Sequence, residues 1–212
     1  MAITIRRSLL FVHGMLLLGG CGHSVKKIPE PIEAPRPLEI GGLLALHDGK
    51  LDHTPACVLE TLIEHVGVME ATGKNDGPEV ESYLRSVELG KGYPWCAAFI
   101  HWSYRECGRV LYPPREFAMA QRFHPTTHRI WQKGKWKRDK DSPEFISQPC
   151  DHFAIWYKNL GRIGHTGVII DEDEKFFRTV EGNTNSEGGR EGNGVFIRYR
   201  LKKTTYCVSR WL

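Results

Sequence analysis

The segment YPWCAAF, residues 93–99, is the part of the sequence around which the predicted domain is organised. Pro94 ends any preceding helix, so we predict that a new helix covers about residues 95–107. Cys96 then lies in the first turn of that helix, at the positive end of its dipole, where the thiolate is favoured over the thiol. The two alanines that follow are small enough to let the helix pack closely against a sheet. These local features fit a nucleophilic cysteine and a buried core cysteine equally well.

The apolar pattern changes along the chain from a helical to a strand period. Upstream of the central segment, apolar residues recur at helical spacing over residues 58–70 and 78–89. Downstream, residues 109–148 are irregular and rich in proline, aromatic and basic residues. We then predict strands over residues 153–157, 166–170, 176–181, 195–201 and 205–211. Helices followed by a run of strands indicate an α+β domain, with N-terminal helices packed on an antiparallel β-sheet.

A nucleophilic cysteine needs a base, and His165 in the strand segment RIGHTGVII (residues 162–170) is the candidate. Residues 171–174 form a natural hairpin tip, which would place His165 opposite Val180 or Glu181. Glu181 is therefore predicted to be a neighbour that orients the imidazole and stabilises its charged form. Asn183 points to the same face of the strand and is the alternative for this role.

Four sequence stretches together resemble a CHAP domain, a branch of the papain-like NlpC/P60 superfamily. They are GKNDGPEV (residues 73–80), PWCAAF (94–99), GHTGV (164–168) and VEGNT (180–184). The resemblance covers about residues 55–200 and implies the papain-like NlpC/P60 fold. One departure is Cys150, which stands where family members usually have the glycine of Pro-Gly-Asp.

The resemblance implies a cysteine peptidase or amidase that hydrolyses amide or peptide bonds in peptidoglycan, with Cys96, His165, Glu181 and Asn183 in the site. Peptidoglycan stem peptides are the expected partners, and no cofactor is expected. The oxyanion would be held by the Cys96 backbone N–H and a second donor, for which Tyr93 and Asn75 are candidates by position.

Other classes of function receive less support from the sequence. His124 and His128 have the spacing of zinc ligands on a helix, but Pro125 lies between them and disfavours that helix, so no metal site is expected. The formal net charge is only +4, which gives no case for nucleic-acid binding. The competing interpretations are a catalytically inactive CHAP-like module that binds the wall or a partner, and a hydrolase or acyltransferase acting on another amide.

Residues 1–20 have the pattern of a lipoprotein signal peptide, with two arginines before an apolar run of about ten residues that is too short to span a bilayer. Residues 18–21, LGGC, resemble a lipobox, which predicts lipidation of Cys21 and attachment to the membrane. A non-cleaved anchor and an ordinary secretory signal are the alternatives. Gly22 in place of aspartate favours the periplasmic face of the outer membrane. Residues 21–42 are proline-rich and predict an extended tether, leaving residues 43–212 as the CHAP-like catalytic domain.

The remaining cysteines are expected to experience the oxidising conditions of the cell envelope. Cys96 and Cys107 are eleven residues apart on one predicted helix, about 16 Å, and cannot form a disulfide with each other. Four cysteines, Cys57, Cys107, Cys150 and Cys207, allow three connectivities. A bond between Cys57 and Cys207 would join the two ends of the domain and is the favoured pairing, with reduced core cysteines as the alternative.

Overall fold

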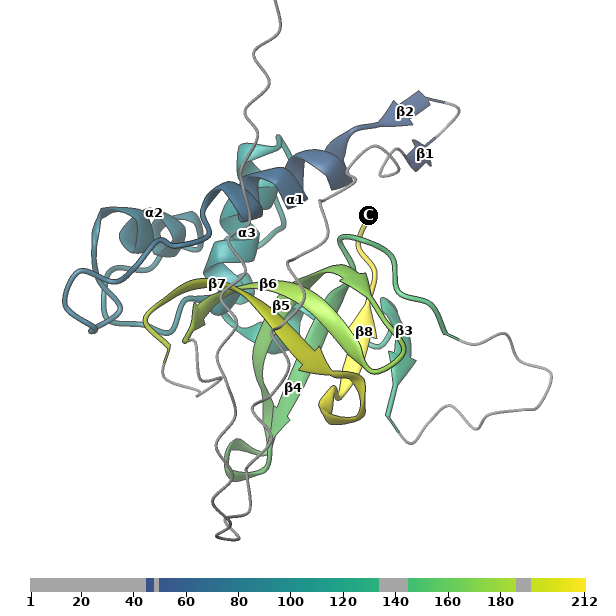
Figure 1. Cartoon of the computed structure of the whole chain (residues 1–212). Coiled ribbons are helices and arrows are strands. Elements are labelled where there is room, and N and C mark those ends of the chain that lie inside the picture. Colours follow the sequence, from purple (N-terminus) through teal and green to yellow (C-terminus); the bar gives the residue numbers. More distant parts are fainter. Residues whose placement is uncertain (1–44, 48–49, 134–144, 186–191) are drawn as a thin grey trace, which may run out of the picture. The chain divides into compact units, whose positions relative to one another are not determined.

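Three helices precede the main sheet in the computed structural model, which describes residues 45–47, 50–133, 145–185 and 192–212 (Figure 1). The described residues belong to one compact unit. The predicted signal peptide, the lipidation site at Cys21 and the tether to residue 42 lie outside the described residues. None of the helices in the described ranges has the length and apolar character needed to cross a membrane.

The helices are α1 (Thr54–Glu64), α2 (Pro78–Ser86) and α3 (Cys96–Glu106). The predictions for α2 and α3 are correct to within three residues, but α1 begins four residues earlier and ends six residues earlier than its apolar pattern indicated. Pro55 occupies its first turn, where the missing N–H costs no hydrogen bond. The segment after α1 instead pairs with a strand, because the Val195 N–H donates to the Val68 carbonyl.

The main sheet has six strands in the order β3-β8-β4-β5-β6-β7, and every neighbouring pair is antiparallel. Its strands are β3 (Arg129–Gln132), β4 (His152–Tyr157), β5 (Arg162–Glu172), β6 (Phe176–Thr184), β7 (Gly194–Leu201) and β8 (Cys207–Ser209). The predicted α+β class and antiparallel sheet are therefore confirmed. The sequence patterns missed β3 and a small hairpin formed by β1 (Ala45–His47) and β2 (Lys50–Asp52). Two short 3-10 helices, η2 (Pro114–Ala118) and η3 (Ala120–Phe123), lie between α3 and β3. Two more, η4 (Lys158–Leu160) and η5 (Lys202–Thr204), connect β4 to β5 and β7 to β8.

Helix α3 packs on the sheet at β5 and β6, and this contact positions Cys96 (Figure 1). Ala97 and Ala98 are completely buried, as their small size predicted. Gly182 on β6 faces the start of the helix, and a Cβ atom there would come within 2.7 Å of the Trp95 ring and 2.8 Å of the Phe99 ring. The absence of a side chain at Gly182 therefore lets the N-terminus of α3 approach the sheet closely.

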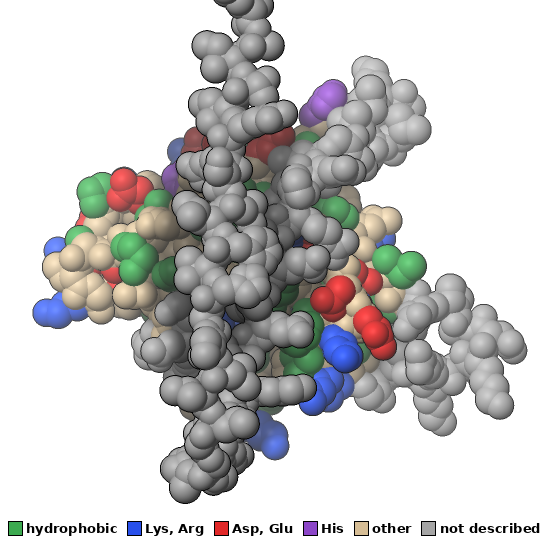
Figure 2. All heavy atoms as spheres, viewed as in Figure 1, with side chains coloured by type: hydrophobic (Ala, Val, Ile, Leu, Met, Phe, Trp, Pro, Cys, Tyr) green, Lys and Arg blue, Asp and Glu red, His purple; other side chains and the backbone are tan. Residues whose placement is uncertain are grey.

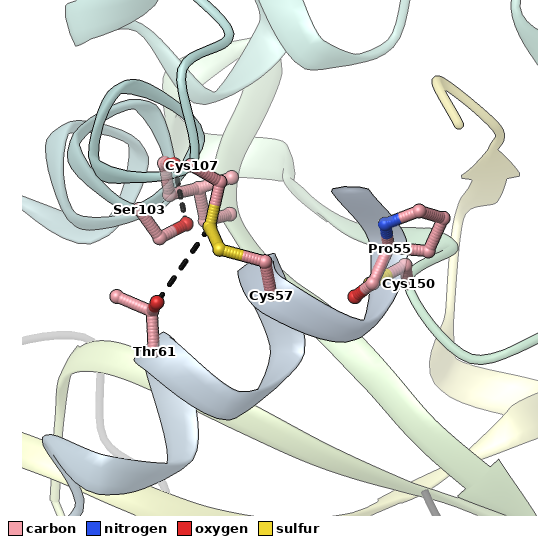
Figure 3. Close-up of a disulfide and its surroundings, with 7 residues drawn as sticks. Pro55, Cys57, Thr61, Ser103, Cys107 and Cys150 are labelled. Atoms are coloured by element: carbon pink, nitrogen blue, oxygen red, sulfur yellow. Dashed lines mark hydrogen bonds between the residues drawn. A yellow bond between two sulfur atoms is a disulfide. The ribbon is translucent and has the colours of Figure 1, made fainter. Parts of the chain in front are cut away.

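The disulfide joins Cys57 to Cys107, so the favoured pairing of Cys57 with Cys207 is wrong (Figure 3). Helices α1 and α3 pack against each other, and this brings the first turn of α1 to the C-terminal end of α3. The two Cα atoms are 5.9 Å apart, a normal disulfide span. Cys207 lies instead in the sheet, in the same buried cluster as Cys96, and remains a free thiol. The expectation that Cys96 would stay free is met.

The surface carries both signs of charge. On the face shown in Figure 2, basic, acidic and hydrophobic side chains of the described residues are interspersed rather than gathered by kind.

Candidate active site

The Cys96 thiol and the His165 ring are both buried where α3 packs on β5, close enough for each to shift the pKa of the other. Burial alone would raise the pKa of the thiol. The hydrogen bond and charge of His165, together with the backbone N–H groups of Thr166 and Ala97, outweigh that effect and lower the pKa of Cys96. The Ala97 N–H belongs to the first turn of α3, where backbone donors have no helical partner. The two residues that sequence reasoning paired are thus brought together in an environment that favours thiolate.

Glu181 forms a hydrogen bond with the ring nitrogen of His165 on the side away from Cys96. Its Oε2 lies 2.8 Å from His165 Nε2, which leaves Nδ1 as the ring nitrogen for Cys96. Burial alone would lower the pKa of His165, but the hydrogen bonds and charges of Cys96 and Glu181 raise it to about 9. A raised histidine pKa beside a lowered cysteine pKa is the signature of a thiolate–imidazolium pair.

The register behind this contact differs from the predicted one. Val168, rather than His165, lies opposite Val180, because the hairpin tip comes later than predicted and a bulge at Ile170 adds a residue to β5. One residue further along from the Val168–Val180 pair, Gly167 lies opposite Glu181. A Cβ atom at Gly167 would come within 2.7 Å of Glu181 Cγ, so the glutamate side chain passes over this glycine to reach His165. The contact is therefore a diagonal one along the strands.

Arg200 on β7 neutralises Glu181 and was not identified from the sequence. Its Nε donates to Glu181 Oε1 at 2.7 Å and its Nη2 donates to Oε2 at 2.5 Å, while Thr179 Oγ1 also donates to Oε1. Burial would raise the pKa of Glu181, but the hydrogen bonds and charges of Arg200 and His165 lower it to about 2. Glu181 is completely buried and ionised because it has a fork-shaped partner. Arginines alternate with Ile197 and Tyr199 along β7, and in the structure these two apolar residues are exposed whereas the arginines are not. This alternation was the sequence signal that could have identified Arg200.

The side-chain contacts of Asn183 are to groups other than the His165 ring, whose Nε2 bonds to Glu181. Asn183 Oδ1 accepts from the Trp95 N–H at 3.1 Å, and its Nδ2 donates to the Gly192 carbonyl and to Asn75 Oδ1. The Asn183 backbone has a φ of 53°, a left-handed conformation that asparagine tolerates well. Asn183 therefore ties the end of β6 to the residue preceding Cys96. It also lines the cleft beside the Cys–His pair.

A cleft of about 440 Å³ opens onto Cys96 and His165. Tyr93 lines this cleft and is half exposed, whereas the Asn75 side chain accepts from Asn183 instead of lining it. Of the two candidates for a second oxyanion donor, Tyr93 is therefore the one placed at the cleft. The Cys96 N–H belongs to the first turn of α3, where backbone donors have no partner within the helix, and it lies beside the thiol.

The features that might have indicated a metal have other roles in the fold. His124 is buried, with Nδ1 bonded to Ser209 and Nε2 bonded to Thr166. Within the described ranges, no group of three or more histidine, cysteine or acidic residues is placed to hold a metal ion.

Comparison with known families bears on this geometry. Residues 88–183 match the CHAP domain family. The CHAP match contains Cys96, His165, Glu181 and Asn183, and it supports the resemblance drawn from the sequence motifs. A CHAP domain suggests a hydrolase-type function directed at peptidoglycan. Arg200 lies beyond the matched region. Comparison with curated proteins and with solved structures gives no match.

Cys150 occupies the position where the sequence departs from the family pattern. Its φ is 72°, a backbone conformation that favours glycine, which explains why a glycine is usual there. The Cys150 thiol lies 2.9 Å from the Pro55 carbonyl, and burial raises its pKa to about 12. This cysteine is an inert packing residue between α1 and the start of β4 rather than a second reactive thiol.

Proposed function

We propose that this protein is a cell-wall cysteine hydrolase that cleaves an amide or peptide bond in peptidoglycan, as an amidase or an endopeptidase. The observation that carries the proposal is the buried chain of contacts from Cys96 to His165, Glu181 and Arg200. Each charge in this chain has a partner of opposite sign. Such a set is costly to bury, and groups with shifted pKa values beside a cleft are typical of functional sites.

The first step is attack by the thiolate. In the resting pair His165 holds the proton, so Cys96 needs no further activation before it adds to the carbonyl carbon of an amide in the cleft. The negative charge that develops on the carbonyl oxygen is stabilised by the Cys96 N–H and, in this proposal, by Tyr93. Glu181 keeps the ring in place and stabilises the imidazolium throughout.

The second step is departure of the amine. His165 donates its proton to the leaving nitrogen, the C–N bond breaks, and a thioester to Cys96 remains. Water then attacks the thioester while the now neutral His165 accepts its proton. Release of the carboxylic acid restores the thiolate and the imidazolium, so atoms and charge balance over the cycle.

A second candidate is a catalytically inactive CHAP-like module that binds the wall or a partner protein. The raised pKa of His165 argues against it, because binding alone does not require an imidazolium held beside a thiol. The third candidate, action on another amide, is compatible with the same machinery and differs only in substrate.

The proposed location is the cell envelope, with Cys21 lipidated and the protein attached to the periplasmic face of the outer membrane. The Cys57–Cys107 disulfide supports an oxidising compartment, since structural disulfides are rare in the cytosol. The hydrophobic leader and the proline-rich segment before residue 43 support a tethered domain.

Digestion of purified muropeptides, followed by mass spectrometry of the products, tests the proposed activity. The wild-type protein should release products shortened at one defined amide bond, and Cys96→Ser should release none. No cleavage by a correctly folded wild-type protein would favour the binding module, and cleavage of other amides alone would favour the third candidate.

A further inference from the structure

A second cavity, of about 410 Å³, adjoins the catalytic cleft and is not used by the proposed chemistry. It lies beside η2, η3, the bulged part of the β4–β5 pair and the C-terminal residues, and Glu116 lines both this cavity and the cleft. Ile163, which also lines it, precedes His165 by two residues on β5, about 7 Å along a strand. A ligand that fills the cavity is therefore within reach of the Cys–His pair.

Four aromatic side chains line this second cavity, which we call the aromatic cavity: Tyr112, Phe117, Trp156 and Trp211. Trp156 is 41% exposed although it lies within a strand of the main sheet. A bulge in β5, where Gly164 is the extra residue, shifts the pairing so that Trp156 lies opposite Ile163. Bulges of this kind redirect side chains next to active sites. Tyr206 supports the Trp156 ring, with ring centroids 5.0 Å apart.

Polar groups stand between these rings. Arg129 lines the cavity and is held by the His124 carbonyl and Gln132 Oε1, so its guanidinium has a defined position. Gln121 also lines the cavity, and Arg122 pairs with Glu116 where the cavity meets the cleft. The cavity thus combines flat apolar surfaces with planar donors and acceptors, and its volume suits a small organic ligand.

We propose that the aromatic cavity binds a sugar ring of the peptidoglycan glycan strand, while an amide linked to that strand occupies the catalytic cleft. A pyranose ring presents apolar C–H groups on its faces and hydroxyl and acetamido groups around its edge. The rings of Trp156 and Tyr112 match the faces, and the side chains of Gln121 and Arg129 match the edge. This inference rests on the proposed function, because it names the part of that substrate that lies beside the bond attacked.

The test uses the full chain with Cys96→Ser, which prevents turnover, and the peptide-free disaccharide GlcNAc–MurNAc as the probe. Nuclear magnetic resonance of the tryptophan indole N–H groups reports the binding position directly. The signals of Trp156 and Trp211 should shift and saturate, and that of Trp102, which packs against Phe99 and Tyr83, should not. Trp156→Ala should weaken binding by about tenfold or more, equivalent to about 1.4 kcal/mol. Tyr199→Ala is the matched control, because Tyr199 is an exposed aromatic on β7 that lines neither cavity.

Several results would overturn the proposal: no shift of Trp156 at saturating disaccharide, equal binding by Trp156→Ala, or the same loss in Tyr199→Ala. A sugar-free stem peptide that shifts Trp156 more strongly than the disaccharide does would assign the cavity to peptide instead. Hydrolysis of muropeptides by the wild-type protein is scored separately. Cleavage without disaccharide binding refutes only the sugar site, and binding without cleavage refutes the hydrolase and leaves the sugar site standing.

Discussion

Gly167→Ala should disable the proposed site without touching any of its reacting atoms. The new Cβ would lie 2.7 Å from Glu181 Cγ, 2.6 Å from Phe153 Cε1 and 3.0 Å from the Val180 carbonyl oxygen. All three distances are too short, and two of the three partners, a ring and a backbone atom, cannot move aside cheaply. Glu181 is the most movable of them, so we expect its carboxylate to be displaced from His165.

The size of the effect follows from the contact that is lost. A hydrogen bond to a charged group is worth about 1.5–3 kcal/mol, which corresponds to a loss of roughly ten- to a hundredfold in kcat. Overpacking should also lower the free energy of unfolding by about 1–3 kcal/mol. Gly90→Ala is the matched control, because a Cβ there meets nothing within 4 Å and Gly90 has no positive φ.

The pH profile separates this mechanism from simple destabilisation. In the wild-type protein the active ion pair is lost on the alkaline side when His165 releases its proton, at a pKa of about 9. Glu181 raises that pKa, so displacing Glu181 should lower it and move the alkaline limb of kcat/KM toward lower pH. The apparent pKa values read from the acidic and alkaline limbs of the profile belong to the Cys96–His165 pair as a whole. Wild-type activity with an unshifted alkaline limb in a folded Gly167→Ala protein would refute the reasoning.

Three further predictions concern other parts of the molecule. Arg200→Met leaves the Glu181 carboxylate buried without its main partner and should lower the free energy of unfolding, measured by urea titration, by about 3–5 kcal/mol. The control is Lys202→Met, which removes a more exposed ion pair with Glu172 and should cost at most about 1 kcal/mol. Equal losses in the two variants would contradict the role assigned to Arg200. Replacing both Cys57 and Cys107 by serine opens a loop of 50 residues and should lower the free energy of unfolding by about 4 kcal/mol. Peptide maps of the wild-type protein under non-reducing conditions should contain the Cys57–Cys107 bond and no disulfide to Cys207. Cys21→Ser should abolish fatty-acid labelling and shift the protein out of the membrane fraction, and labelling that persists in the variant would refute lipidation at this residue.

The sequence patterns were sufficient for the elements that depend on local chemistry. Pro94 was enough to predict where α3 starts. Cys96 and His165 were expected to lie close together because a nucleophilic cysteine needs a base beside it. Glu181 was found because its strand was found, even though the pairing was offset. The register failed because a bulge and the position of a hairpin tip depend on packing that a two-residue period does not encode.

The interactions that were missed or misassigned join segments far apart in the chain. Arg200 reaches Glu181 only because β7 lies beside β6, and the disulfide partner of Cys57 was decided by the packing of α1 on α3. The entropic argument for joining the two chain ends chose the longest loop and ignored which cysteines the fold brings together. The alternation of Arg198 and Arg200 with Ile197 and Tyr199 along β7 was the local signal that a partner acid should be sought.

The claim that Cys96 is a thiolate paired with the His165 imidazolium is tested most directly by alkylation. Iodoacetamide would be added to the native protein between pH 5 and pH 9, followed by peptide mapping of each free cysteine, and the same series run on His165→Gln. Cys96 should react well below the pH at which an ordinary thiol does, while Cys150 and Cys207, whose pKa values burial raises to about 12, stay unmodified. His165→Gln should move the reactivity of Cys96 to higher pH. A Cys96 that reacts only as an ordinary thiol does, or at the same pH with and without His165, would contradict the account.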